Sequence, residues 1–200
     1  MAGGAVMTPF EFLTVFFSFA YALAFSHVLL AAAEMIRHRQ VLKFSWPHAL
    51  WMANAVMLLF SNWISLYDFR SMEVMTLGTI LTLFVFVTTL YFTCALVTPD
   101  FDAGDGYDMR AFHLRQSRAY IGAILALDIV SFLSNLQAGH SGVIDWGSQN
   151  AIVLAMTPMA LIPLLTRNRV VQIVCPNILL IEQFAFLMIY YPSLSLTGPH

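Results

Sequence analysis

Six apolar segments, each long enough to cross a lipid bilayer, constrain the fold of this chain more than any other feature of its sequence. They cover approximately residues 10–34, 47–67, 73–98, 118–137, 148–166 and 170–191. The hydrocarbon layer of a bilayer is about 30 Å thick, and a helix of about 20 apolar residues spans it. Because backbone polar groups in that layer need partners within the protein, each segment should be an α-helix. The sequence therefore predicts an all-α, polytopic transmembrane bundle of six helices.

The composition agrees with a membrane protein and excludes other classes. Hydrophobic residues make up 60% of the 200 residues and charged residues 10%, which is more apolar surface than a soluble domain of this size can bury. The net charge of -2 argues against a nucleic-acid partner. The connecting segments have at most about 19 residues, too few for a separate domain. Residues 1–200 should therefore form a single integral membrane domain.

Lysine and arginine residues alternate between the loops. The first, third and fifth loops carry eight of the nine, namely Arg37, Arg39, Lys43, Arg110, Arg115, Arg118, Arg167 and Arg169, and only Arg70 lies elsewhere. Because cytoplasmic loops are enriched in these residues, the three loops should face the cytoplasm, and both termini should lie outside the cytoplasm. The segments divide equally well into two inverted triplets or into three hairpins.

Ionisable side chains inside the apolar segments are the candidate functional residues. Counted at about 1.5 Å per residue from the basic edge of each segment, His27, Asp128 and Glu182 fall within roughly 5 Å of one another in depth. Asn54 belongs to the same layer. Such groups are costly in hydrocarbon unless they are paired, neutral or hydrated, so they are functional candidates. The sequence predicts a substrate or proton site at these four residues.

Other polar residues should support this site. Ser131 and Asn135 follow Asp128 at helical spacing, and Glu34 follows His27 in the same way. Asn177 follows Pro176, and a proline within a helix leaves a backbone carbonyl without its usual donor. The alternative for each residue is that its side chain only fixes helix packing.

No cofactor, metal or catalytic motif is predicted. His27 has no second histidine at its depth to hold a haem between helices, and no HExxH or HxxxH spacing occurs. The aspartates between residues 100 and 108 do not have the spacing of a calcium loop. After them, MRAFHLRQSRAY should form a short amphipathic helix on the inner membrane surface, in contact with phospholipid head groups.

One segment of the sequence is similar to a known group of proteins. AAAEMIRHRQVLKFSWPHALW, with Glu34, Arg37, His38 and Arg39 followed by a Trp-Pro-His sequence, resembles a group of small bacterial inner-membrane proteins without an assigned activity. The resemblance implies several passes through a cell membrane, the bacterial cytoplasmic (inner) membrane, and no particular activity.

Three functions are compatible with these features. The first is that the protein moves or senses a small solute or protons through the polar interior site. The second is a structural or accessory subunit whose polar residues only hold helices together or bind a partner, and the third is a membrane-embedded enzyme that acts on lipid. A transporter or sensor predicts a hydrated interior cavity, an enzyme predicts an opening to lipid near His48 and His113, and a subunit predicts no cavity. The lipid bilayer is the expected partner. The sequence is compatible with an oligomer but does not define the oligomeric state.

Overall fold

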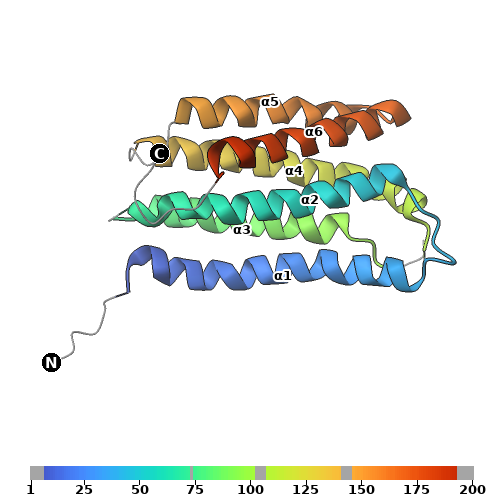
Figure 1. Cartoon of the computed structure of the whole chain (residues 1–200), viewed down its shortest axis with the longest axis horizontal. Helices are drawn as coiled ribbons and strands as arrows, with labels where there is room; N and C mark the ends of the chain where they lie inside the picture. The colour runs from blue at the N-terminus through green and yellow to red at the C-terminus, as the bar shows by residue number, and fades with distance from the viewer. Residues whose placement is uncertain (1–6, 73, 102–106, 141–145, 193–200) are drawn as a thin grey trace.

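The chain is all-helical over the residues that the computed structural model describes, which are 7–72, 74–101, 107–140 and 146–192. Within these ranges it forms six α-helices, so the predicted fold class is confirmed (Figure 1). The helices are α1 (Pro9–Arg37), α2 (Trp46–Ser65), α3 (Leu77–Val97), α4 (Met109–His140), α5 (Trp146–Leu165) and α6 (Arg169–Tyr190), and a 3-10 helix, η1 (Leu66–Ser71), follows α2.

Five of these helices are long and apolar enough to cross a membrane. The exception is α5, whose apolar part over the described residues, Asn150–Leu165, is shorter. Large apolar side chains cover the outside of the bundle: Phe19 is 69% exposed, and Leu30 and Ile181 are each 67% exposed. A bilayer would cover this apolar surface, so the helices fit an integral membrane protein.

Local signals set the helix ends. Thr8 and Glu11 form a capping box at the start of α1, with Pro9 in its first turn. At the starts of α3 and α6, the side chains of Thr76 and Asn168 each accept a hydrogen bond from a backbone N–H group of the first turn. These caps supply partners for backbone N–H groups that a helix leaves unpaired at its first turn.

The start of α4 differs from the prediction. The sequence places it near residue 118 and assigns residues 109–120 to a separate surface helix, whereas α4 begins at Met109 and runs without a break to His140. The reason is a cap: Asp108 Oδ1 accepts hydrogen bonds from the backbone N–H groups of Arg110 and Ala111. The prediction of a separate surface helix was therefore wrong, because this segment forms the first three turns of α4.

Helices α2 to α6 form a ring, and α1 lies outside it. Each helix from α2 to α6 packs on the next, and α6 closes the ring by packing on α2. Helix α1 packs on α3 and α2 at one edge of the molecule (Figure 1). The core of the ring holds fully buried side chains, among them Trp51, Leu90, Tyr120, Ile124 and Leu179.

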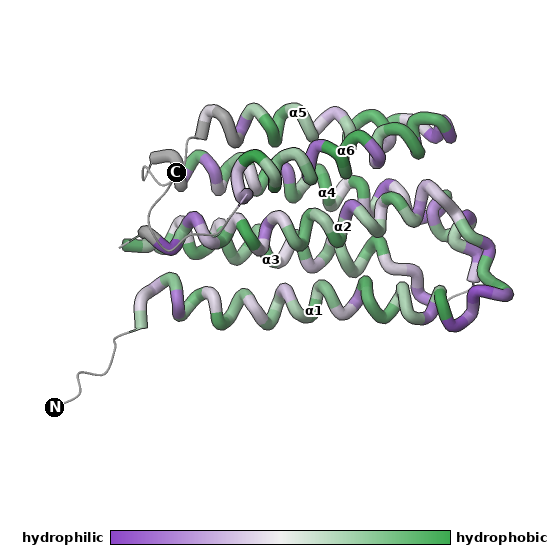
Figure 2. The backbone as a smooth tube through the Cα atoms, viewed as in Figure 1, coloured by the Kyte–Doolittle hydropathy of each residue, from purple (hydrophilic) through white to green (hydrophobic). Residues whose placement is uncertain are grey.

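Hydrophilic residues concentrate at one end of the bundle, where α1 is joined to α2, α3 to α4 and α5 to α6 (Figure 2). We call this the basic end, because the lysine and arginine residues of the first, third and fifth loops lie there. The opposite end is formed by η1 and the start of α3.

Candidate functional site

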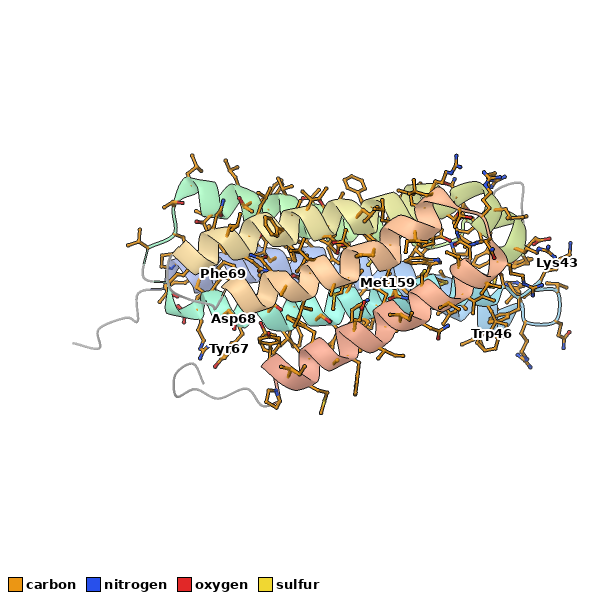
Figure 3. All side chains as sticks on the ribbon, turned by 90° about the horizontal axis from the view of Figure 1, so that it is seen from above. Lys43, Trp46, Tyr67, Asp68, Phe69 and Met159 are labelled. Atoms are coloured by element: carbon orange, nitrogen blue, oxygen red, sulfur yellow. The ribbon has the colours of Figure 1, made fainter. Side chains whose placement is uncertain are left out.

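The ring contains a cavity of about 90 Å³, which we call the Asp128 cavity. Its polar wall consists of Ser61, Asn62, Ser65 and Asp68 from α2 and η1, Asp128, Ser131, Ser134 and Asn135 from α4, and Gln183 from α6. Apolar side chains such as Leu83, Phe86 and Met156 complete it. Asp68 and Phe69 mark its outer part, at the end of the bundle opposite Lys43 and Trp46 (Figure 3).

Three buried polar atoms face the interior here without a partner. Asp128 Oδ2, Ser134 Oγ and Gln183 Oε1 have no hydrogen-bond partner among the described groups. Asp128 is only 9% exposed. A buried polar atom without a partner costs about 1 to 3 kcal/mol. Water or a polar solute in the cavity would remove this cost.

The charged groups of the cavity are both acidic. Among the described residues that line it, Asp128 and Asp68 are carboxyls, and none is Lys, Arg or His. At its outer part, the Tyr191 hydroxyl donates a hydrogen bond to Asp68 Oδ2.

Asn54 joins α2 to α6 below the cavity. It is fully buried, and its Nδ2 donates to the carbonyl oxygens of Leu50 at 2.8 Å and Pro176 at 2.9 Å. Its Oδ1 accepts a hydrogen bond of 2.9 Å from Gln183 Nε2. Asn54 thereby holds Gln183 at the cavity wall, where Gln183 Oε1 can still accept a hydrogen bond.

The bundle is tightly packed between this layer and the basic end. Trp51 precedes Asn54 on α2, while Tyr120 and Ile124 precede Asp128 on α4, and all three are at most 1% exposed. The cavity therefore extends from Asp128 toward Asp68 and is blocked in the other direction.

His27 does not reach the cavity. It is exposed on α1, outside the ring, and its Nε2 is hydrogen bonded to the Tyr91 hydroxyl of α3 at 3.0 Å. The buried face of α1 runs through Phe17, Tyr21, Ala24, Val28 and Ala31. At about 100° per residue, His27 lies roughly a quarter turn away from the middle of that face.

Three further predicted residues also lie away from the cavity. Glu182 is half-buried and is not among the lining residues, and its Oε2 has no partner among the described groups. Glu34 pairs with Arg37 and His38 near the basic end. Asn177 is exposed, and its Nδ2 donates to the Ile173 carbonyl of its own helix at 2.7 Å.

The predicted residues of α4 lie together at the cavity. Ser131 and Asn135 line the same cavity as Asp128, and Asn135 Nδ2 donates to Asn150 Oδ1 of α5 at 3.2 Å. Sequence reasoning missed Gln183 because it favoured the adjacent carboxylate. A signal was present, since Cys175, Leu179 and Gln183 recur every four residues along the buried face of α6.

A second cavity, of about 280 Å³, lies at the basic end, and we call it the basic pocket. Its lining residues are Phe44, Ser45, Trp46, Pro47, Arg110, His113, Leu114, Ser117, Arg167, Arg169 and Gln172. His113 is buried and is hydrogen bonded to the Tyr120 hydroxyl. His48 is fully buried, and its Nε2 donates to the Val97 carbonyl at 2.8 Å.

Within the parts of the chain that the structure describes, no group of three or more His, Cys, Asp or Glu side chains is arranged to hold a metal ion. Comparisons with protein-family models, with curated proteins and with solved structures found no match. The function has to be inferred from the two cavities.

Proposed function

We propose that this membrane protein binds a proton or a small solute at Asp128, inside the ring of helices, and moves or senses it. The observation that carries the proposal is the buried Asp128 carboxyl, which lines the Asp128 cavity beside hydroxyl and amide groups and whose Oδ2 has no hydrogen-bond partner among the described residues. A carboxylate within a membrane-spanning helix is costly unless it is neutralised, paired or hydrated.

The charge of the cavity favours a proton or a cationic solute. No described lining residue is basic, so no side chain of the wall is available to neutralise Asp128. The hydroxyl and amide groups of Ser131, Ser134 and Gln183 can instead bind water or a hydrogen-bonding solute.

The size of the cavity limits its occupant. A cavity of about 90 Å³ has room for a few water molecules or for one small ion with some of its hydration. Drug-sized ligands use pockets of about 300 to 1,000 Å³. A proton carried through water, or a solute of a few atoms, fits this volume.

Proton movement is tested by reconstituting the full chain into liposomes that enclose a pH-sensitive dye. After a pH step, with potassium and valinomycin cancelling the membrane potential, the wild type should dissipate the gradient faster than protein-free liposomes. Asp128→Asn should reduce the rate to that of protein-free liposomes, because an amide cannot take up and release the proton. Asp128→Glu should retain activity.

Glu34→Gln is the matched control, since it also removes a carboxylate but at a position that pairs with Arg37 and His38. His27→Phe and Glu182→Gln should leave the rate close to that of the wild type, because neither residue lines the cavity. A strong loss of proton flux in either variant would indicate that the substituted residue does belong to the site.

Sensing without movement is tested by amide hydrogen exchange of residues 124–137 at two pH values. The wild type should change its protection with pH, and Asp128→Asn should not. If neither flux nor exchange depends on Asp128, the proposal fails, and a packing role in an accessory subunit is favoured.

A further inference from the structure

The basic pocket concentrates positive charge in one cavity. Three of its lining residues are arginines: Arg110 in the first turn of α4, Arg167 between α5 and α6, and Arg169 at the start of α6. None of the three forms an ion pair with a carboxylate of the described residues. No described lining residue is acidic. Because like charges repel, an anion between these arginines would be strongly favoured.

Helix ends add to this potential. Helices α2 and α6 both begin at the pocket, and neither has an acidic residue in its first turn. The N-terminus of a helix carries partial positive charge and unpaired N–H groups. The side chain of Ser45 does not cap α2, so N–H groups of that first turn remain available to a ligand.

Buried polar side chains form the wall of the pocket. Ser45, His113, Ser117 and Gln172 are each at most 9% exposed. Gln172 Nε2 donates hydrogen bonds to the carbonyl oxygens of Pro163 at 2.7 Å and Thr166 at 2.9 Å. Gln172 Oε1 has no hydrogen-bond partner among the described groups. The wall thus offers a buried acceptor beside the cations, which suits a ligand with both an anionic group and a hydroxyl.

The rim of the pocket is apolar and exposed. Phe44, Trp46 and Leu114 are 54%, 67% and 49% exposed, and the rings of Phe44 and Trp46 lie 5.1 Å apart. Trp side chains are enriched where a bilayer meets water. A ligand that carries acyl chains could place them along this rim.

We propose that the basic pocket binds the phosphate-bearing head group of an anionic phospholipid. Arginine recognises phosphate with paired, charge-assisted hydrogen bonds, and a glycerol hydroxyl of the head group can donate to Gln172 Oε1. This site is independent of the Asp128 cavity, which lies on the other side of the packed layer around Trp51 and Tyr120.

The test uses the full chain, purified in a neutral detergent and titrated calorimetrically with short-chain phosphatidylglycerol or phosphatidylcholine. Phosphatidylglycerol should bind more tightly. The double variant Arg167→Gln with Arg169→Gln should weaken its binding at least about tenfold, since two charge-assisted contacts are removed. The control is Arg37→Gln with Arg39→Gln, which removes two charges from the same end but outside the pocket, and it should bind nearly as well as the wild type.

Glycerol phosphate, added as a competitor, distinguishes the source of the phosphate. If it displaces the lipid, the pocket recognises phosphate and a soluble phosphate ester can occupy it; if it does not, the lipid is required. Arg110→Gln, made alone, keeps the test available should the double variant not fold. Equal binding by wild type and pocket variants, or an equal loss in the control, would overturn the proposal, because the general charge of the basic end would then explain the binding.

Discussion

At the scale of single residues, Asn54 illustrates how a polar side chain is accommodated inside this bundle. Both N–H groups of its amide donate to carbonyl oxygens, and its Oδ1 accepts from Gln183. Pro176 takes part through its carbonyl group, so the proline of α6 is tied directly to α2. The hydrogen bonds from Asn54 to Pro176 and Gln183 cross between the two helices, so they should stabilise the closed ring.

We expect Asn54→Leu to lower the free energy of unfolding by about 1 to 2 kcal/mol, because it removes two interhelical hydrogen bonds and leaves Gln183 buried without partners. The control is Asn177→Leu, the same substitution at an exposed position of α6 whose hydrogen bond stays within its own helix. It should change stability by less than about 0.5 kcal/mol. Unfolding in a denaturing-detergent titration measures both, and equal effects would contradict this account of Asn54.

The same residues explain what the sequence could and could not predict about the site. Depth can be counted from the sequence because the rise per residue is fixed, and the hydrogen bond between Asn54 and Gln183 places these two residues of α2 and α6 at one level of the bundle. The sequence does not predict which residues of other helices lie beside each residue at that depth. Whether His27 faces the ring depends on where α1 packs, and that is decided by long-range contacts that no local pattern encodes.

At the scale of elements, the start of α4 is fixed by contacts with the first loop. Lys43 and Asp108 pair through their side chains at 3.0 Å. Their backbones are also joined, since Lys43 N–H donates to the Tyr107 carbonyl at 2.9 Å and Met109 N–H donates to the Lys43 carbonyl at 3.2 Å. The first and third loops are therefore connected at the basic end.

This arrangement predicts a pH dependence. Hydrogen bonds from the Ala111 backbone and from Lys43 lower the pKa of Asp108 below its usual value. A carboxyl whose pKa is lowered by folding stabilises the folded state at neutral pH, and this contribution is lost as the pH falls through the lowered pKa. Amide exchange of Arg110 and Ala111, corrected for its intrinsic pH dependence, should therefore accelerate in acid.

Asp108→Asn is the test variant, because an asparagine can still cap α4 but has no carboxyl to titrate. In this variant the first turn of α4 should lose its dependence on acid pH. If exchange in the variant and the wild type responds equally to acid, the Asp108 carboxyl does not control this helix end.

The length of α4 was underestimated for a physical reason. Hydropathy detects the part of a helix that fits the hydrocarbon layer, and residues 118–137 are that part. The 32 residues of α4 extend about 48 Å at 1.5 Å per residue, well beyond the roughly 30 Å layer. The first turns of α4 carry Arg110, His113 and Ser117 into the basic pocket, where a polar sequence is favoured over an apolar one.

At the scale of the whole molecule, the ring of five helices with α1 outside it was not predictable. Short loops require neighbours in sequence to pack as hairpins, and α3, α4, α5 and α6 do so. The closure of α6 on α2 and the packing of α1 on α3 join helices that are not consecutive. These contacts leave α1 out of the cavity wall, which is why the polar residues of α1 and of α4 lie apart.

The two cavities lie toward opposite ends of the bundle, so the orientation of the protein decides which side of the membrane each one faces. Charge predicts that the basic end faces the cytoplasm, because Lys and Arg favour cytoplasmic loops. In a background with Cys94 and Cys175, both buried, replaced by alanine, a single cysteine is introduced at Gln40 or at Val74, which are exposed at the two ends. A membrane-impermeant maleimide should label Val74→Cys in intact bacterial spheroplasts and Gln40→Cys only after lysis. The reverse pattern would place the basic pocket against the outer leaflet and the Asp68 side of the cavity toward the cytoplasm, and it would contradict the orientation inferred from charge.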